Sequence, residues 1–309
     1  MIYTVTLNPA IDKTVVIENL LPGSVNRILS AREDAGGKGI NVSKCLKNMG
    51  EDSVAAMILA GQTGKRLDTM LKNMKIHMLR IHTEGENRTN LKIIDPVKGE
   101  NTDINEPGPR IDMQLLEQMK KKLGHSVGKG DIVVLSGSLP KGTPPELYAD
   151  WITFFRQLGA CVYLDADGEP MRKGMAAVPY MIKPNNDELA AMLGKETLTR
   201  EEMIAEGIRL HKTGIAEVVI SLGGDGALFV SSDGVFRAAG VPVPVKSTVG
   251  AGDSMVAAMA FSQARNLSRE EKIRLSVAMG AASVMQDGSQ PPESALVWEL
   301  AKKVQVEKL

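Results

Sequence analysis

The most informative segment of the chain is Lys246-Ser-Thr-Val-Gly-Ala-Gly-Asp-Ser-Met-Val-Ala-Ala-Met-Ala260. An extended segment rich in valine and proline, 241–245, leads into it, and strong helix formers fill its second half. This pattern predicts a loop that opens a helix over 254–263. The glycines let the backbone approach a ligand closely, and unpaired N–H groups at a helix start attract anions. We therefore expect an anion site on the backbone of Gly250, Ala251 and Gly252.

Asp253 is the most informative residue of this loop. A carboxylate beside an anion site repels the anion, so we expect it there only if it binds a metal ion or takes part in a proton transfer. One such role is that of a base, which removes the proton from a hydroxyl group that attacks a phosphoryl group. The alternative is that Asp253 only caps the helix, and the motif alone leaves both interpretations open.

Composition excludes several classes of partner. The chain has 309 residues, with 37 basic and 37 acidic side chains, and carries no charged tail. Nucleic acid and anionic membranes are therefore poor candidates for partners. The two cysteines form no paired motif, the N-terminus lacks the features of a signal peptide, and no apolar run could span a bilayer. We expect a soluble, cytoplasmic protein.

Apolar strands alternate with helical segments along most of the chain. Residues 2–7, 54–60, 131–136 and 161–164 are typical of buried parallel strands, and helical segments lie between them. This alternation predicts one α/β domain over 1–309, with a mostly parallel central sheet flanked by helices. Segments 11–33 and 86–106 instead resemble hairpins. We expect them to form a small inserted β-sheet that acts as a lid over a cleft.

Several residues are candidates for binding a substrate at this cleft. Asp12 follows the first strand, and ligands of open α/β sheets gather at the carboxyl ends of strands. A second glycine-rich helix start contains Gly37, Lys38 and Asn41, which could hold a phosphate and hydroxyl groups. The alternatives are a solvent-facing turn for Asp12 and a surface cation for Lys38.

Two arginines on the predicted hairpins could clamp a phosphate. Arg88 and Asn90 are two residues apart on one strand, so they face the same side of the sheet. If that side faces the cleft, Arg88 can bind a phosphate bidentately, as can Arg27 from the other hairpin. A solvated strand charge is the alternative for both arginines.

Two further segments suggest nucleotide and metal binding. Asn185 and Glu188 lie three residues apart across a helix start and could supply oxygens to a hydrated Mg²⁺, although helix capping also explains them. Gly223 and Gly226 lie in a tight turn that could expose backbone to a nucleotide, with a plain hairpin turn as the alternative. The sequence contains neither a Walker A motif nor Gly-x-Gly-x-x-Gly, which argues against the usual P-loop and dinucleotide folds.

Six motifs in order resemble the phosphosugar kinases of the ribokinase family. They are Thr6-Leu-Asn-Pro-Ala-Ile-Asp12, Ala35-Gly-Gly-Lys-Gly-Ile-Asn41, Ser136-Gly-Ser-Leu-Pro140, Lys183-Pro-Asn185, Ser221-Leu-Gly223 and Ser247-Thr-Val-Gly-Ala-Gly-Asp253. The resemblance covers nearly the whole chain. It implies a ribokinase-like fold and transfer of phosphate from ATP, with Mg²⁺, to a hydroxyl group of a sugar phosphate.

The resemblance also implies a role for each matching residue. Asp253 corresponds to the catalytic base and Gly250, Ala251 and Gly252 to the anion hole. The sugar-phosphate contacts correspond to Asp12, Gly37, Lys38, Asn41, Arg88 and Ser138. The ATP and magnesium side corresponds to Lys183, Asn185, Glu188, Ser221, Gly223, Gly226, Ser247 and Thr248.

Substrate and assembly follow from the same resemblance. The expected acceptor is fructose 1-phosphate, phosphorylated at its C6 hydroxyl, with tagatose 6-phosphate and fructose 6-phosphate as alternatives. A more distant alternative is a regulator that binds a sugar phosphate without catalysis. The free face of the lid sheet suggests a homodimer, because an uncovered sheet face tends to be covered.

Overall fold

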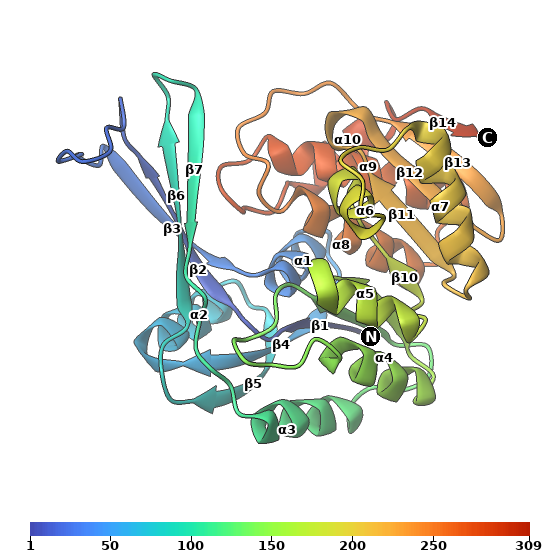
Figure 1. Ribbon diagram of the computed structural model, residues 1–309, viewed down its shortest axis with the longest axis horizontal. Helices are drawn as coiled ribbons and strands as arrows, with labels where there is room; N and C mark the ends of the chain where they lie inside the picture. The colour runs from blue at the N-terminus through green and yellow to red at the C-terminus, as the bar shows by residue number, and fades with distance from the viewer.

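A ten-stranded sheet forms the centre of the computed structural model, which describes residues 1–309 (Figure 1). Its order is β14-β13-β12-β11-β10-β9-β8-β1-β4-β5. The strands are β1 (Ile2–Thr6), β4 (Ser53–Ala60), β5 (His77–Thr83), β8 (Ile132–Ser136), β9 (Cys161–Asp165), β10 (Met181–Ile182), β11 (Glu217–Ser221), β12 (Gly226–Ser231), β13 (Gly234–Ala239) and β14 (Val306–Lys308).

Most of these strands are parallel, as the alternation of strands and helices predicted. The run from β11 to β5 pairs in parallel throughout, whereas β12, β13 and β14 add an antiparallel edge. The apolar side chains of β1, β8 and β9 are buried on both faces of the sheet. Strands of this kind require helices on both sides.

Helices cover both faces and make two separate cores. The first core contains side chains from α3 (Met113–Gly124), α4 (Leu147–Gln157), α5 (Gly168–Ala176), α6 (Asn186–Met192) and α7 (Arg200–Lys212). The second contains side chains from α1 (Lys38–Asn48), α8 (Ala251–Ala264), α9 (Arg269–Val284) and α10 (Ser294–Ala301), while α2 (Gly61–Asn73) packs in a smaller cluster with α1 and β4. The result is a three-layer α/β/α fold.

Helix α8 lies at the centre of the second core. Its alanine and methionine side chains are buried on almost every side, and its contacts with α9 are extensive. The helix begins at Ala251, three residues before the predicted start. Asp253 therefore lies within the first turn of a buried helix, which removes its side chain from bulk water.

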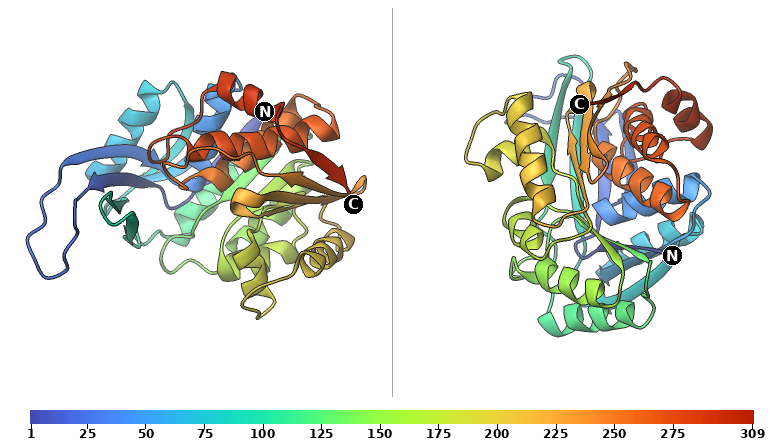
Figure 2. Two further views of the ribbon diagram at one scale, coloured as in Figure 1. Left: turned by 90° about the horizontal axis from the view of Figure 1, so that it is seen from above. Right: turned by 90° about the vertical axis from the view of Figure 1, so that its right-hand side faces the viewer.

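A separate four-stranded sheet projects beside the main body (Figures 1 and 2). Its order is β3 (Ser30–Gly36), β2 (Ala10–Val16), β6 (Arg88–Asp95), β7 (Glu100–Asn105). The two hairpins pair through the parallel contact between β2 and β6. The predicted segment 11–33 forms β2 and β3, but their pairing stops at Val16 and Ser30. Residues 17–29 form a long connection that contains a tight turn at Pro22-Gly23, closed by the hydrogen bond from the Ser24 N–H to the Leu21 carbonyl group at 3.3 Å.

The two sheets together place polar side chains around one opening. Strands β1, β8, β9 and β10 are parallel neighbours, so their carboxyl ends lie at one edge of the large sheet. Strands β2 and β6 of the small sheet start at Ala10 and Arg88, which pair with each other close to this edge. No helix of the chain combines the length and the apolar character needed to cross a bilayer.

Candidate active site

A polar cleft of about 390 Å³ lies between the small sheet, the starts of α1 and α8, and the ends of β9 and β10. A second polar cavity of about 250 Å³ continues from it toward Thr6, Asn8 and Ser138. Both cavities share Gly37, Lys38, Arg88 and Asn90 in their walls. A lining this polar suits a small, charged and hydroxylated ligand rather than an apolar one.

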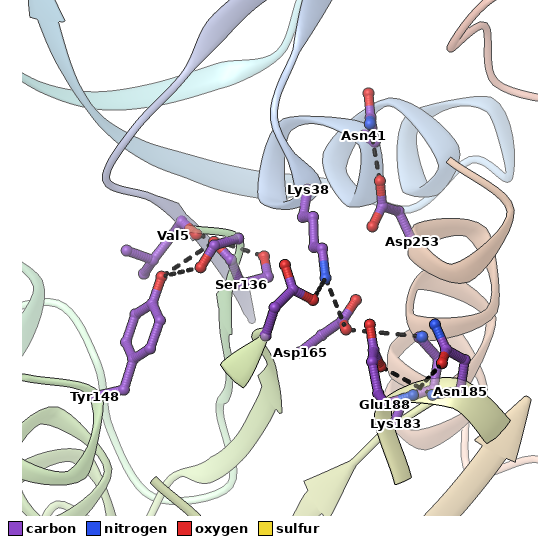
Figure 3. Close-up of polar contacts among 12 residues, drawn as sticks. Val5, Lys38, Asn41, Ser136, Tyr148, Asp165, Lys183, Asn185, Glu188 and Asp253 are labelled. Carbon is purple, nitrogen blue, oxygen red and sulfur yellow. Dashed lines mark hydrogen bonds and ion pairs between the residues drawn. The ribbon is translucent and has the colours of Figure 1, made fainter. Parts of the chain in front are cut away.

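Asp253 lies at the base of the cleft and is not a helix cap. The N-cap of α8 is Gly250, whose φ of 80° is in the left-handed region that favours glycine. The Asp253 carboxylate is buried and accepts a hydrogen bond of 2.8 Å from the Asn41 amide (Figure 3). Burial, together with the nearby negative charge of Asp165, raises the pKa of Asp253 to about 6. A carboxyl group with this pKa is suited to accept a proton near neutral pH.

The backbone of this loop forms the predicted anion site. The N–H groups of Gly252 and Asp253 make no hydrogen bond within the chain. A side chain at position 252 would place its Cβ 2.9 Å from the Lys183 Nζ, so glycine is needed for the lysine to approach the helix start. Two free N–H groups, a helix dipole and an ammonium group therefore converge on one point.

A buried carboxylate, Asp165, organises the cations of the cleft. It ends β9, and its Oδ1 lies 3.3 Å from the Lys38 Nζ and 3.7 Å from the Lys183 Nζ (Figure 3). Lys38 also pairs with Asp167 at 2.9 Å. Burial alone would lower the pKa of Lys38, but these two carboxylates raise it, so Lys38 stays charged.

Asp165 and Asp167 are site residues beyond those expected from the sequence. Asp165 follows a strand in the same way as Asp12, so the rule that selected Asp12 would have found Asp165 as well. Nothing local distinguishes Asp167 from an ordinary loop aspartate, because its importance comes from the ion pair with Lys38, which is 129 residues away in the chain.

On the opposite wall, Asp12, Asn90 and Arg88 face the cleft from the small sheet. The Asn90 amide donates to the Asp12 carboxylate at 2.8 Å. Arg88 donates to the backbone carbonyl groups of Asn8 at 3.2 Å and Glu106 at 3.5 Å, and no carboxylate lies within 4.0 Å of it. Burial lowers the pKa of Arg88 and raises that of Asp12. The guanidinium is thus a half-buried cation without an anionic partner.

Four buried polar atoms around the cleft have no hydrogen-bond partner in the chain. They are the Thr6 hydroxyl oxygen and the amide oxygens of Asn8, Asn41 and Asn90. Buried acceptors without a partner cost free energy unless a ligand supplies donors. Sugar hydroxyl groups are such donors, whereas an ionised phosphate has none. Ser138, predicted at this wall, accepts from the Asn8 amide at 3.3 Å.

Asn185 and Glu188 form a capping box at the start of α6. The Asn185 Oδ1 accepts from the Glu188 N–H at 2.7 Å, and the Glu188 Oε2 accepts from the Asn185 N–H at 2.9 Å (Figure 3). The capping alternative is therefore correct for both residues. Glu188 keeps its second carboxylate oxygen, and both residues line the cleft.

The remaining predicted residues line neither cavity; they are Ser221, Gly223, Gly226, Ser247 and Thr248. Ser221 is connected to Asn185 by a parallel β-bridge, and Ser247 and Thr248 precede Gly250 by three and two residues. Glycine at 226 is explained by packing, because a Cβ there would lie 2.0 Å from the Ala238 carbonyl oxygen.

Arg27 does not reach the cleft of its own chain. It is exposed in loop 17–29, between β2 and β3, and lines neither cavity. The prediction that it clamps a phosphate beside Arg88 is therefore wrong within one chain. Local sequence could not show this, because the long loop, rather than the strand pattern, decides where Arg27 points.

Comparison with known proteins agrees with this geometry. The model of the pfkB family carbohydrate kinases matches residues 5–296. The chain is 35% identical to the 1-phosphofructokinase of Bacillus subtilis, with 100% of both chains covered, and 35% identical to that of Escherichia coli, with 92% of this chain and 91% of the relative covered.

Solved structures show the same fold. The phosphofructokinase-2 of Escherichia coli in complex with fructose-6-phosphate superposes with a TM-score of 0.91 at 29% identity, covering 98% of each chain. Ribokinase from Arabidopsis thaliana, at 22% identity and a TM-score of 0.77 over 97% of this chain and 98% of that one, confirms the ribokinase-like fold. This chain is therefore a member of the pfkB family of carbohydrate kinases.

Proposed function

We propose that this protein transfers the γ-phosphoryl group of ATP to the C6 hydroxyl group of fructose 1-phosphate and so forms fructose 1,6-bisphosphate. One observation carries the proposal. A buried carboxylate, Asp253, lies beside two free N–H groups at one side of a polar cleft, and an unpaired guanidinium, Arg88, lies at the other. The first side suits phosphoryl transfer to a hydroxyl, and the second suits a phosphate already on the acceptor.

The chain's own groups divide the chemistry between them. Asp253 accepts the proton of the attacking hydroxyl, which its pKa of about 6 allows at neutral pH. The free N–H groups of Gly252 and Asp253 and the Lys183 ammonium stabilise the negative charge that builds up on the transferring phosphoryl oxygens. Asn41 orients the base by its hydrogen bond. The polar wall formed by Asp12, Asn90 and Asn8 holds the sugar hydroxyl groups.

The carboxyl groups near the start of α6 fit a magnesium ion. Glu188 and Asp167 lie within hydrogen-bonding reach of one another, and burial together with this contact raises the pKa of Glu188. Two such neighbours need a proton or a cation between them. Mg²⁺ usually takes one or two carboxylates and keeps several water molecules, so Glu188 and Asp167 would hold it. When bound with ATP, it would neutralise phosphate charge. Asn185 is left out of this set because its oxygen caps α6.

Two other acceptors use the same mechanism. The similarity to a phosphofructokinase-2 in complex with fructose-6-phosphate favours that sugar phosphate as the second candidate, and tagatose 6-phosphate is the third. A regulator without catalysis is a weaker alternative, because the base, the free N–H groups and Lys183 are all in place.

The decisive experiment measures ADP release by the purified protein with ATP against the three sugar phosphates, with and without Mg²⁺. The highest kcat/KM for fructose 1-phosphate, with turnover that requires Mg²⁺, would support the proposal. A preference for either 6-phosphate would keep the mechanism and change the substrate. Absence of turnover with all three sugar phosphates, despite ATP binding, would favour the regulator without catalysis.

The pH dependence of kcat/KM is expected to show the ionisation of Asp253. The base acts when deprotonated, so the rate constant should rise with pH through about 6 and then level off. Asp165→Asn removes the neighbouring negative charge that raises this pKa, so the midpoint should move to lower pH even though the rate falls. Because the phosphate of the substrate titrates in the same range, both enzymes are compared with one substrate. An identical midpoint would contradict the assignment.

A homodimer through the small sheet is also part of the proposal. The connection between β2 and β3 carries exposed apolar side chains, including Leu21, Val25 and Leu29, which are 54%, 85% and 61% exposed. Exposed apolar groups of this density favour association. Light scattering should give twice the chain mass of 33.2 kDa, and Val25→Asp with Leu29→Asp should reduce it to one chain. A monomeric wild-type protein at micromolar concentration would contradict the dimer.

A further inference from the structure

We infer that Asn90 selects the position of the substrate's phosphate, by accepting a hydrogen bond from the hydroxyl group on the ring carbon next to the phosphate-bearing carbon. The inference rests on the proposed function. It adds a residue that distinguishes a 1-phosphate from a 6-phosphate, which the phosphate and the reacting hydroxyl cannot do by themselves.

The chemistry of the sugar defines what has to be recognised. In a fructofuranose ring the C1 and C6 carbons lie outside the ring on either side of the ring oxygen, so the two monophosphates have nearly the same shape. They differ at the ring carbon that carries the phosphorylated arm. In fructose 1-phosphate this carbon, C2, bears a hydroxyl group. In fructose 6-phosphate and tagatose 6-phosphate the corresponding carbon, C5, bears hydrogen.

The position of the phosphate follows from the charges of the cleft. Four cations line it, and carboxylates lie within 4.0 Å of Lys38, Lys92 and Lys183. Lys92 pairs with Asp103 at 2.9 Å. Arg88 has only carbonyl partners. A phosphate gains most at the cation that is not already neutralised, and Arg88 also offers bidentate geometry.

The position of Asn90 follows from the strand. Arg88 and Asn90 lie on one face of β6, two residues apart, which is about 7 Å along a strand. Asn90 lines both the polar cleft and the second polar cavity. With the phosphate on Arg88, the carbon next to the phosphorylated arm therefore lies level with the Asn90 side chain.

The orientation of the Asn90 amide is fixed by its neighbour. Its nitrogen donates to the Asp12 carboxylate at 2.8 Å, and an ionised carboxylate can only accept, so the amide cannot be reversed without losing this bond. The amide oxygen is thereby turned away from Asp12. It is buried and has no partner in the chain. Such an acceptor favours a ligand with a hydroxyl at that point and penalises one with hydrogen there.

The test uses a substrate without the critical hydroxyl group. The 1-phosphate of 2,5-anhydro-D-mannitol is fructose 1-phosphate lacking the C2 hydroxyl, and because the parent sugar is symmetric, its 1- and 6-phosphates are one compound. We compare kcat/KM for this analogue, fructose 1-phosphate and fructose 6-phosphate in the wild type, Asn90→Ala and Asn90→Ser. Asn101→Ala, an exposed asparagine on the same hairpin outside the cleft, is the control.

Both Asn90 variants are expected to lose roughly 10²-fold more in kcat/KM for fructose 1-phosphate than for the other two compounds. The ratio of fructose 1-phosphate to the analogue then falls toward one, while the control keeps the wild-type ratio. Each ratio is taken within a single variant, so a partly misfolded preparation does not alter it.

Two results would overturn the inference alone. An equal loss for all three compounds would mean that Asn90 only supports Asp12 and the small sheet, and an unchanged ratio would mean that the hydroxyl is recognised elsewhere. A wild-type protein that prefers fructose 6-phosphate would instead overturn the proposed function, and this inference with it.

Discussion

Asp253→Asn is expected to lower kcat by roughly 10²–10⁴-fold, while the KM values for ATP and the sugar phosphate stay near those of the wild type. The asparagine has nearly the same shape, so it leaves the cleft intact and removes only the ability to accept a proton. The free N–H groups of the glycine loop and the Lys183 ammonium remain, which explains why part of the rate enhancement should survive. Steady-state kinetics with fructose 1-phosphate measures both parameters.

The same substitution is expected to stabilise the folded protein at neutral pH. Burial raises the pKa of Asp253 from 3.8 to about 6, so the folded state binds this proton more tightly than the unfolded state does. The wild type therefore loses stability as the pH rises from about 4 to about 6, by about 3 kcal/mol for a shift of this size. Asparagine does not ionise, so the variant should exceed the wild type in free energy of unfolding by the full amount at pH 8 and by nothing near pH 4. Urea denaturation of both proteins at both pH values measures this difference.

A matched control is Asp150→Asn, because Asp150 is exposed and pairs with Lys120 far from the cleft. It should change neither kcat nor the pH dependence of stability beyond a few tenths of a kcal/mol. Turnover by Asp253→Asn at the wild-type rate, or a loss of ATP affinity with normal turnover, would contradict the role of Asp253 as a base.

Arg88→Ala is expected to lower kcat/KM for fructose 1-phosphate by about 10²-fold or more, mainly through KM. Arg88 has no carboxylate partner, so a bound phosphate is its main source of charge-assisted hydrogen bonds. Each such bond contributes about 1.5–3 kcal/mol. Arg88→Lys keeps the charge but loses the bidentate geometry, and should recover only part of the affinity.

The best readout for Arg88 is the difference between substrates with and without a phosphate. Unphosphorylated fructose should be an equally poor substrate for the wild type and for Arg88→Ala, since it lacks the group that Arg88 binds. Arg80→Ala, which removes a partly exposed arginine of β5 paired with Asp68, should leave both substrates unaffected. If Arg88→Ala reduced turnover of fructose and fructose 1-phosphate by the same factor, Arg88 would hold the fold and not the phosphate.

Local patterns were enough to predict the framework of the protein. Apolar strands that end at glycine, proline or aspartate predicted the parallel sheet, and the glycine-rich starts of α1 and α8 predicted two anion-binding turns. These features depend on neighbours in the chain, because strand burial and helix initiation are decided over a few residues. The motifs at 35–41 and 247–253 also identified the family, since they occur together and in order.

Other features depended on contacts between distant parts of the chain. The hydrogen bond that orients Asp253 comes from a residue 212 positions away, and the one that orients Asn90 from a residue 78 positions away. The raised pKa of Asp253 results from burial inside the second core and from the charge of Asp165. These contacts join residues far apart in the chain, so local sequence patterns could not predict them.

The amino-acid sequence was enough to identify residues capable of the chemistry: the base, the glycine loops and the set of cations. Which of these residues act together became clear only from the three-dimensional arrangement. It assigned Asn185 to a helix cap, moved Arg27 out of its own cleft, brought in Asp165 and left Arg88 without an anionic partner. The physical reason is that capping, ligand binding and ion pairing use the same residue types. Only the spatial arrangement of charges and burial distinguishes these roles.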